Sequence, residues 1–388
     1  MMLLFCIARS TLSPSMVNET RLVELFKQLV LINAPSFEEQ DCVAFVKNHL
    51  IGMGLEVWED DAGAKIGGKA NNLIAKLPAN KPGLKSVFLS AHFDTVEPTE
   101  GLIIEEKDGF LYSASDTILG ADDKGGMAPA IEALQVLLET SAPHGDIYLL
   151  FSVCEEGGLK GAAALDIQSL DVDFGFVLDT GPPVGTFVTR TSTNDRFTVT
   201  ITGKPAHAGK DPEKGINAIM VAASAIEGMP IGRIGPETTS NLGIISGGTG
   251  VNVVCPEVVI KGEARSTSLQ ELEDLMDTII KRFQAAGAKW GAQVHIDHRR
   301  DYGSYELSPD AEVVKIATTA SRNLGFEPAL RTTLGGSDAN IYNAKGVPTI
   351  VVATGMDLIH THEERISRKE LVDTTRLVLE ILRLVAES

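Results

Sequence analysis

Cysteine is scarce in this sequence. Its 388 residues include four cysteines, which lie far apart and form no CxxC pair: Cys6, Cys42, Cys154 and Cys255. This spacing supports neither a disulfide framework nor a zinc site built from thiolates. It fits a reducing compartment best, so we expect a cytoplasmic protein.

Basic residues and long apolar runs are also in short supply. Lys and Arg number 34 against 52 Asp and Glu, and the formal net charge is −18 at pH 7. Nucleic acids and anionic membranes require clustered basic residues, so we expect neither as a partner. The sequence has no apolar run near the ~20 residues that a membrane-spanning helix needs.

The first residues lack the marks of a secretion signal. The apolar stretch at 3–8 is too short for the core of a signal peptide, and no basic residue precedes it. Met16 stands just before the first convincing helix and is a second candidate for the start of the protein. We therefore expect residues 1–15 to be a disordered or non-native extension.

The first part of the chain alternates helices and strands, as a wound α/β domain does. Ser36 and Glu39 have the spacing of a capping box, which predicts a helix from there to about residue 50. Apolar runs without alternation indicate buried strands that are covered on both sides, at 86–90, 146–153 and 174–178.

The order of elements changes after residue 185. The pattern becomes β-α-β-β-α-β, which is the order of a ferredoxin-like domain, with elements at 196–202, 216–228, 241–246, 257–264, 269–286 and 293–298. The α/β pattern resumes at 308 and includes a strand at 349–353. We therefore predict one catalytic domain, 1–187 and 300–388, interrupted by an inserted lid at 188–299.

Acidic and histidine residues gather where three of the predicted strands end. His92 and Asp94 close the first strand, Glu155 and Glu156 follow the second, and Asp179 follows the third. In open α/β sheets ligands bind beyond the carboxyl ends of the strands, so these clusters can converge on one crevice. Such convergence is what a metal site requires.

Each cluster also has an ordinary structural explanation. A histidine at a strand end is commonly hydrogen-bonded to a neighbouring group and has no further role. Adjacent carboxylates such as Glu155 and Glu156 can simply be a solvated pair. Asp122 precedes a predicted helix and could be its N-cap, although this does not explain Asp123 beside it among several glycines.

Taken together, the candidates indicate two metal ions. Five ligand candidates are too many for one four-coordinate zinc, but they suit two zincs that share a carboxylate: His92, Asp122, Glu156, Asp179 and His360. Glu155 would then remain unligated as the general base. Cobalt or manganese would also suit these ligands, because histidine and carboxylate select poorly among such ions.

These motifs resemble the di-zinc exopeptidase family, which includes peptidase T, the glutamate carboxypeptidases, the aminoacylases and succinyl-diaminopimelate desuccinylase. The matching strings occur in this order: SAHFDTVEP, TILGADDKGG, CEEGG, VLDTG, GKPAHAG and HTHEERI. The likeness covers nearly the whole chain from about Met16 and is nearest to the peptidase T branch. It implies an α/β catalytic domain with a mixed sheet flanked by helices, plus a ferredoxin-like lid that often dimerises.

The resemblance also implies roles for particular residues. His92 and Asp179 would bind one zinc, Glu156 and His360 the other, and Asp122 would bridge the two ions through a carboxylate followed by a cis peptide bond. Asp94 would support His92, and Glu155 would be the catalytic base. His362 competes with His360 as the last ligand, but His360 fits the family spacing, in which a glutamate follows four residues later.

The predicted lid carries three further candidates. His207 matches a family histidine that stabilises the developing oxyanion, often in the partner subunit's active site, although it could be an ordinary surface histidine. Asn252 and Arg265 resemble residues that grip a substrate carboxylate, whereas an ordinary salt bridge would equally account for Arg265. The resemblance therefore implies a homodimer formed through the lid.

We expect a metal-dependent hydrolase that cleaves an amide bond of short peptides, most closely a tripeptide aminopeptidase. An N-acyl amino acid deacylase or a carboxypeptidase would use the same metal centre, and a non-catalytic metal- or peptide-binding protein is a further alternative. The sequence has no HExxH motif and no GxSxG nucleophile elbow, which argues against single-zinc and serine mechanisms.

Overall fold

The computed structural model describes residues 13–388, so Cys6 and most of the expected N-terminal extension lie outside the described residues. The chain divides into two compact units. Unit 1 contains the residues up to Thr189, then Glu306–Thr332 and Ser337–Ser388. Unit 2 contains Arg190–Tyr305 and a short later segment, Thr333–Gly336, which the sequence pattern did not separate from its surroundings.

Unit 1 is built on a mixed sheet of eight strands. Four neighbouring strands at its centre, in the order β6-β3-β7-β15, run parallel to one another, while β2 and β8 pair antiparallel on either side. The full order is β1 (Glu56–Glu59), β2 (Leu73–Leu77), β6 (Ile147–Ser152), β3 (Val87–His92), β7 (Phe174–Thr180), β15 (Thr349–Ala353), β8 (Thr186–Arg190) and β14 (Ala329–Thr332).

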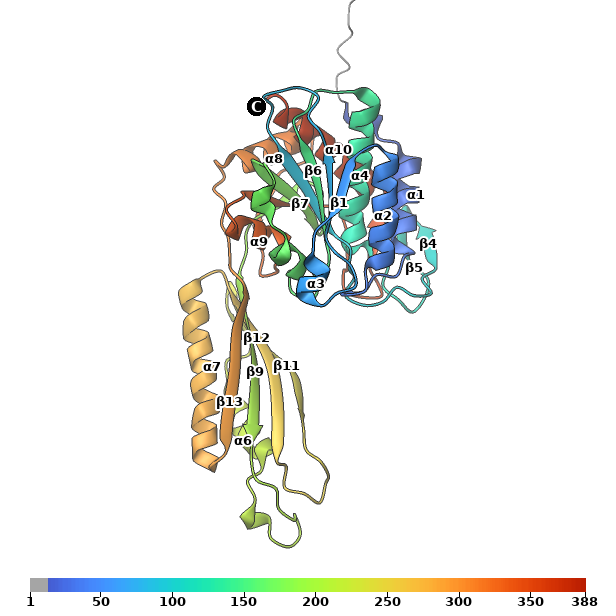
Figure 1. Cartoon of the computed structure of the whole chain (residues 1–388). Helices are drawn as coiled ribbons and strands as arrows, with labels where there is room; N and C mark the ends of the chain where they lie inside the picture. The colour runs from blue at the N-terminus through green and yellow to red at the C-terminus, as the bar shows by residue number, and fades with distance from the viewer. Residues whose placement is uncertain (1–12) are drawn as a thin grey trace, which may run out of the picture. The chain divides into compact units, whose positions relative to one another are not determined.

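Helices cover both faces of this sheet, as the continuous apolar runs predicted (Figure 1). On one face lie α1 (Glu19–Val30), α2 (Gln40–Gly52), α4 (Ala121–Thr140), α8 (Glu312–Asn323) and α10 (Arg368–Val385). The other face carries the short helices α5 (Lys160–Ala164) and α9 (Asp338–Ala344), with α3 (Ala62–Ile66) packed on α5.

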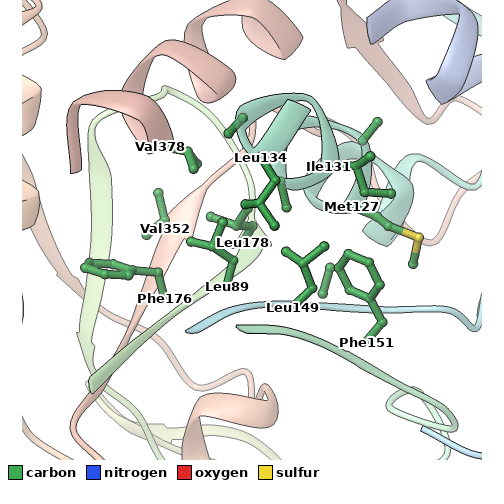
Figure 2. Packing of buried hydrophobic residues seen from close by; sticks show 14 of the residues in the cluster. Leu89, Met127, Ile131, Leu134, Leu149, Phe151, Phe176, Leu178, Val352 and Val378 are labelled. Atoms are coloured by element: carbon green, nitrogen blue, oxygen red, sulfur yellow. The ribbon is translucent and has the colours of Figure 1, made fainter. Parts of the chain in front are cut away.

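The core of unit 1 lies between the sheet and its larger helical layer. Figure 2 shows side chains of the central strands meeting those of α4 and α10, and all of the labelled residues are buried: Leu89, Met127, Ile131, Leu134, Leu149, Phe151, Phe176, Leu178, Val352 and Val378. On the opposite face, Phe88 packs edge-on against Tyr342 of α9, with ring centroids 5.1 Å apart. The central strands are thus held rigidly from both sides.

A small sheet of three strands, in the order β16-β5-β4, also belongs to unit 1. Its strands are β4 (Ile104–Lys107), β5 (Phe110–Ser113) and β16 (Arg365–Ser367). Short turns of 3₁₀ helix occur at Pro14–Met16, Ile167–Ser169 and, in unit 2, Pro212–Lys214.

Unit 2 is an antiparallel sheet of five strands, in the order β10-β11-β12-β9-β13, with two helices on one face. Its strands are β9 (Thr193–Thr202), β10 (Gly232–Gly235), β11 (Thr238–Gly247), β12 (Glu257–Ser266) and β13 (Gln293–Tyr302), and its helices are α6 (Ala218–Ile226) and α7 (Leu269–Trp290). The long helix α7 runs along the strands (Figure 1). Unit 2 has a hydrophobic core of its own, which includes Phe197, Val199 and Phe283.

The predicted capping box is wrong. Helix α2 begins at Gln40, and its N-cap Glu39 makes no side-chain capping bond. Ser36 and Glu39 use their side chains for contacts with the strand ends instead, as described below. Among residues 13–388, none of the helices combines the length and apolar character needed to cross a membrane.

Candidate metal centre and active site

The parallel strands of unit 1 bring the predicted ligands to one edge of the sheet. His92 is the last residue of β3, Asp179 lies next to the end of β7, and Glu155 and Glu156 follow β6. His360 lies in the loop that follows β15. Because these strands are parallel neighbours, their carboxyl ends meet at the same edge.

Asp122 stands at the N-terminal end of α4, and its carboxylate lies between two histidines. Its Oδ1 is 3.1 Å from Nε2 of His92, and its Oδ2 is 3.2 Å from Nε2 of His360. The peptide bond between Asp122 and Asp123 is cis, in agreement with the resemblance. One carboxylate therefore faces two separate groups of ligand candidates.

Glu156 lies on the same side of that carboxylate as His360. Nε2 of His360 is 2.8 Å from Oε1 of Glu156. His362 is directed elsewhere, because its two ring nitrogens contact carboxylates at 2.8 and 3.1 Å, those of Glu97 and Asp116. The geometry favours His360 over His362 as the ligand candidate.

On the other side, His92 and Asp179 are close. Nε2 of His92 is 4.0 Å from Oδ1 of Asp179. The Nδ1–H of His92 donates a hydrogen bond of 2.9 Å to the backbone carbonyl of Asp94, so Nε2, which faces Asp122, is the nitrogen that could bind a metal. The Oδ1 of Asp94 lies 3.5 Å from the same Nδ1.

Asp94 is fully buried and accepts several hydrogen bonds. Its Oδ1 accepts the backbone N–H of Glu155 at 2.8 Å, and its Oδ2 accepts the backbone N–H of Glu156 at 3.0 Å and the hydroxyl of Ser36 at 2.6 Å. Burial alone would raise the pKa of Asp94, but its bonds with His92 and these donors lower it. An ionised Asp94 thus ties the histidine on β3 to the acidic pair after β6.

Glu155 is buried beside the ligand candidates. Burial raises its pKa well above the ordinary value, and the negative charges of Asp179 and Asp338 add to this rise against the opposing effect of His92. Burial and the neighbouring negative charges therefore increase the affinity of this carboxylate for a proton, which suits a general base.

The other pKa shifts show how much negative charge gathers here. Burial would raise the pKa of Asp122, but its contacts with His360 and His92 lower it, whereas burial and the charge of Asp122 raise the pKa of Asp179 well above normal. Hydrogen bonds with Asp122 and Glu156 raise the pKa of His360 to about 10. A proton on His360 therefore offsets part of the repulsion between these carboxylates. Bound metal cations would offset the same repulsion.

The donor set fits divalent metal ions. Ligand atoms from His92, Asp122 and Glu156 lie within 4.8 Å of one another, and so do ligand atoms from His92, Asp123 and Asp179. Two donors on one tetrahedral zinc lie about 3.3 Å apart, given bonds of about 2.0 Å. The separations between ligand atoms of the five candidates given above, which run from 2.8 to 4.0 Å, bracket that value.

Sequence reasoning missed the residues that support the strand ends. Ser36 contacts Asp94, and Oε1 of Glu39 accepts the backbone N–H groups of Phe37 and Cys154, each at 2.9 Å. The buried ammonium of Lys124 donates a hydrogen bond to the carbonyl of Phe93. The sequence places Lys124 directly after two aspartates, but it does not show that the ammonium group is buried.

Two further carboxylates, those of Asp123 and Asp338, are buried near the ligand candidates. Oδ2 of Asp123 accepts the backbone N–H of His92 at 3.2 Å, while its Oδ1 has no hydrogen-bond partner among the described residues. Asp338 accepts the hydroxyl of Ser152, its Oδ1 is also unpartnered there, and burial raises its pKa to about 6. Both carboxylates add to the negative charge that a metal would offset.

The predicted lid residues lie in unit 2. His207 and Asn252 are both exposed and lie on adjoining segments, since Ala208 donates its N–H to the carbonyl of Asn252 at 3.0 Å. Arg265 is half-buried and makes two hydrogen bonds, of 3.0 and 3.1 Å, with the carboxylate of Glu263. The structure therefore groups His207 with Asn252 within unit 2 and pairs Arg265 with a carboxylate.

Comparison with known proteins places these features in context. The family described as Peptidase family M20/M25/M40 matches residues 88–384. The crystal structure of aminopeptidase PepT from Bacillus cereus ATCC 10987 is 39% identical, with a TM-score of 0.86, and covers 96% of this chain and 100% of that chain. The crystal structure of a tripeptidase from Staphylococcus aureus is 36% identical over the same shares of the two chains, with a TM-score of 0.91. The uncharacterized protein YqjE of Bacillus subtilis strain 168 is 38% identical over 96% of this chain and 100% of its own length.

Proposed function

Because the chain belongs to the peptidase family M20/M25/M40 and is a metallo-exopeptidase of its peptidase T-like branch, we propose that it removes the N-terminal residue of tripeptides at a centre of two zinc ions. The observation that carries this proposal is the placement of Asp122. One oxygen of its carboxylate faces His92, and the other faces His360. Glu155 is buried next to these residues and is the proposed base.

The proposed ligands form two groups that share Asp122. His92 and Asp179 would complete one zinc site, and Glu156 and His360 the other. When bound, the metals would lower the pKa of a water molecule and polarise the scissile carbonyl. Cobalt or manganese would fit the same donors.

Glu155 would act as the general base and then as the acid. It takes a proton from the attacking water as the oxygen adds to the carbonyl carbon, and it returns that proton to the leaving amine as the C–N bond breaks. The products are a free amino acid and a shortened peptide. Asp94 would hold His92 in the tautomer that keeps Nε2 free, as its hydrogen-bond distances favour.

Unit 2 would act as the lid and the dimerisation domain. Its exposed His207 would donate a hydrogen bond to the developing oxyanion, and Asn252 and Arg265 would grip a substrate carboxylate, for which Arg265 must exchange its partner Glu263. A homodimer through this unit is supported by two exposed isoleucines, Ile244 and Ile245, on the part of β11 that extends beyond its pairing with β10.

We place the enzyme in the cytoplasm, with short peptides as its substrates. The cysteines among the described residues, Cys42, Cys154 and Cys255, are free and buried, which suits a reducing compartment.

Hydrolysis of one tripeptide in three forms tests which end is recognised. The zinc-loaded enzyme is assayed on the free, the N-acetylated and the C-amidated peptide, with product amino acids identified by mass spectrometry. Acetylation removes the ammonium group that an aminopeptidase recognises, so it should lower kcat/KM by roughly 100-fold or more.

Other outcomes would replace the proposal. Activity only on the acetylated peptide indicates a deacylase, and loss confined to the amidated peptide, with release of the C-terminal residue, indicates a carboxypeptidase. Stoichiometric metal binding with no hydrolysis of any form indicates a binding protein.

A further inference from the structure

Glu364 is a buried carboxylate close to the candidate metal centre. It lies at the end of the loop that carries His360, directly before β16. The base of this loop is closed by Asp357 and Arg365, whose backbone groups exchange hydrogen bonds of 2.9 and 3.0 Å and whose side chains form an ion pair of 2.8 Å. With only 1% of its surface exposed, Glu364 points into unit 1 and not into solvent.

Both oxygens of Glu364 accept backbone N–H groups at the start of α4. Oε2 accepts from Gly120 at 2.6 Å, and Oε1 accepts from Asp122 at 2.9 Å. Gly120 is the N-cap of α4 and has no side chain with which to cap the helix. A carboxylate 244 residues away in the sequence therefore takes the place of a local cap.

This arrangement connects two metal-ligand candidates through one side chain. Glu364 holds the backbone of Asp122, and it ends the short loop on which His360 is mounted. The two candidates meet with 3.2 Å between Nε2 of His360 and Oδ2 of Asp122. His360 has a φ of 62°, in the left-handed region, so its backbone needs an anchor to stay in this conformation.

The remaining candidates are positioned differently. His92 and Asp179 lie on β3 and β7, two paired strands in the middle of the sheet. Their places depend on the hydrogen bonds of the sheet and on the core beneath it. Loss of Glu364 should therefore disturb one side of the centre more than the other.

We propose that Glu364 is a positioning residue that aligns Asp122 with His360, so that the metal held by Asp122, Glu156 and His360 binds tightly. This inference rests on the two-metal centre proposed above. A carboxylate is required because both acceptors face N–H donors, and the amide nitrogen of a glutamine would meet one of those donors.

The test compares Glu364→Gln with wild type and with Glu363→Gln, a matched control at the adjacent exposed glutamate. Zinc is titrated calorimetrically into each metal-free full-length protein. Wild type and the control should bind two zinc ions with the same affinities. Glu364→Gln should bind the zinc of Asp122, Glu156 and His360 about 10- to 100-fold more weakly, as is common when a group that orients a ligand is lost, and the other zinc, which shares Asp122, with a clearly smaller loss.

A second variant covers the case in which Glu364→Gln does not fold. Glu364→Asp keeps the charge and both acceptors on a shorter side chain, and it should show a smaller loss at the same zinc site. Wild-type affinity for both zincs in Glu364→Gln overturns the proposal, and so does an equal loss at both sites, whether or not the Tm of the metal-free protein falls. If wild type itself binds fewer than two zincs, the proposed metal centre fails, whatever the role of Glu364.

Discussion

The two units of this protein differ in where their carboxylates lie and in what these carboxylates contact. In unit 1, carboxylates gather at the ends of strands that are covered on both faces, and Asp94, Asp122 and Glu155 are all buried. In unit 2, helices cover one face of the sheet, and several strand carboxylates pair with arginines, as in Arg265–Glu263 and Arg300–Asp195.

This difference distinguishes charged residues that are compatible with folding stability from those that only a function explains. A buried carboxylate is costly unless it is hydrogen-bonded or neutralised, and a cluster of them cannot be explained by stability. A partly exposed ion pair costs little and adds about 0–1 kcal/mol. The buried cluster of unit 1 is therefore the place where a substitution should change chemistry more than folding.

The largest expected effect is on turnover. Glu155→Gln keeps the shape of the side chain but removes the base, so kcat on a tripeptide should fall by about 1,000-fold. Both zincs should remain bound, since Glu155 is not among the proposed ligands, and metal content can be measured by mass spectrometry. Near-normal kcat would show that Glu155 is not the base.

The next effect tests whether the units keep separate cores. Phe283 is fully buried in unit 2, and Phe283→Ala should lower the free energy of unfolding of that unit by about 3–5 kcal/mol. Urea denaturation followed by circular dichroism measures this loss. Zinc affinity should stay unchanged, and a parallel loss of zinc binding would contradict the separation.

A smaller effect is expected on the pH dependence of the folding stability of the metal-free protein. The folded pKa of His360 is about 10 against an ordinary value of 6.5, because Asp122 and Glu156 favour its charged form. The resulting stability is fully present below about pH 6.5 and is lost as the pH rises to about 10. The Tm of the chelator-treated wild type should fall across that range, and the Tm of His360→Gln should fall less. Equal slopes of Tm against pH in the two proteins would show that His360 is not the source of the pH dependence. Since the side chain is 45% exposed, the shift should be modest.

The smallest effect is expected on the surface of unit 2. Lys281 and Asp277 form an exposed ion pair of 3.0 Å on α7. Lys281→Ala should change the free energy of unfolding by less than about 0.5 kcal/mol, as measured by the same urea experiment. A loss above about 1 kcal/mol would mean that unit 2 also depends on its charges.

Much of the fold followed from periodicity in the sequence. The strand predicted at 349–353 matches β15 at both ends, and the four strands and two helices expected at 196–298 all occur in unit 2. Elements with weak patterns were missed. β4 has the sequence IEEK and carries no apolar run, so only its pairing with β5 defines it as a strand.

The incorrectly predicted capping box shows that a short sequence pattern does not predict contacts with residues far away in the sequence. Ser36 and Glu39 have the right spacing for a helix cap, yet they bind Asp94 and the backbone of Cys154, which lie 58 and 115 residues away. A pattern only a few residues long contains no information about such partners. The same holds for Glu364, whose spacing from His360 was noticed but whose contact with the start of α4 was not.

The sequence by itself determined the residue types and their order: acids and histidines after buried strands, and an inserted β-α-β-β-α-β unit. These features depend on the local pattern of hydrophobic residues, which can be read from residues close together in the sequence. Only the tertiary structure decided that His360 and not His362 faces Glu156, that Asp122 presents one oxygen to each side, and that Glu364 caps α4. Those contacts join residues up to 244 positions apart, and only the packing of parallel strands and their loops brings them within hydrogen-bond distance.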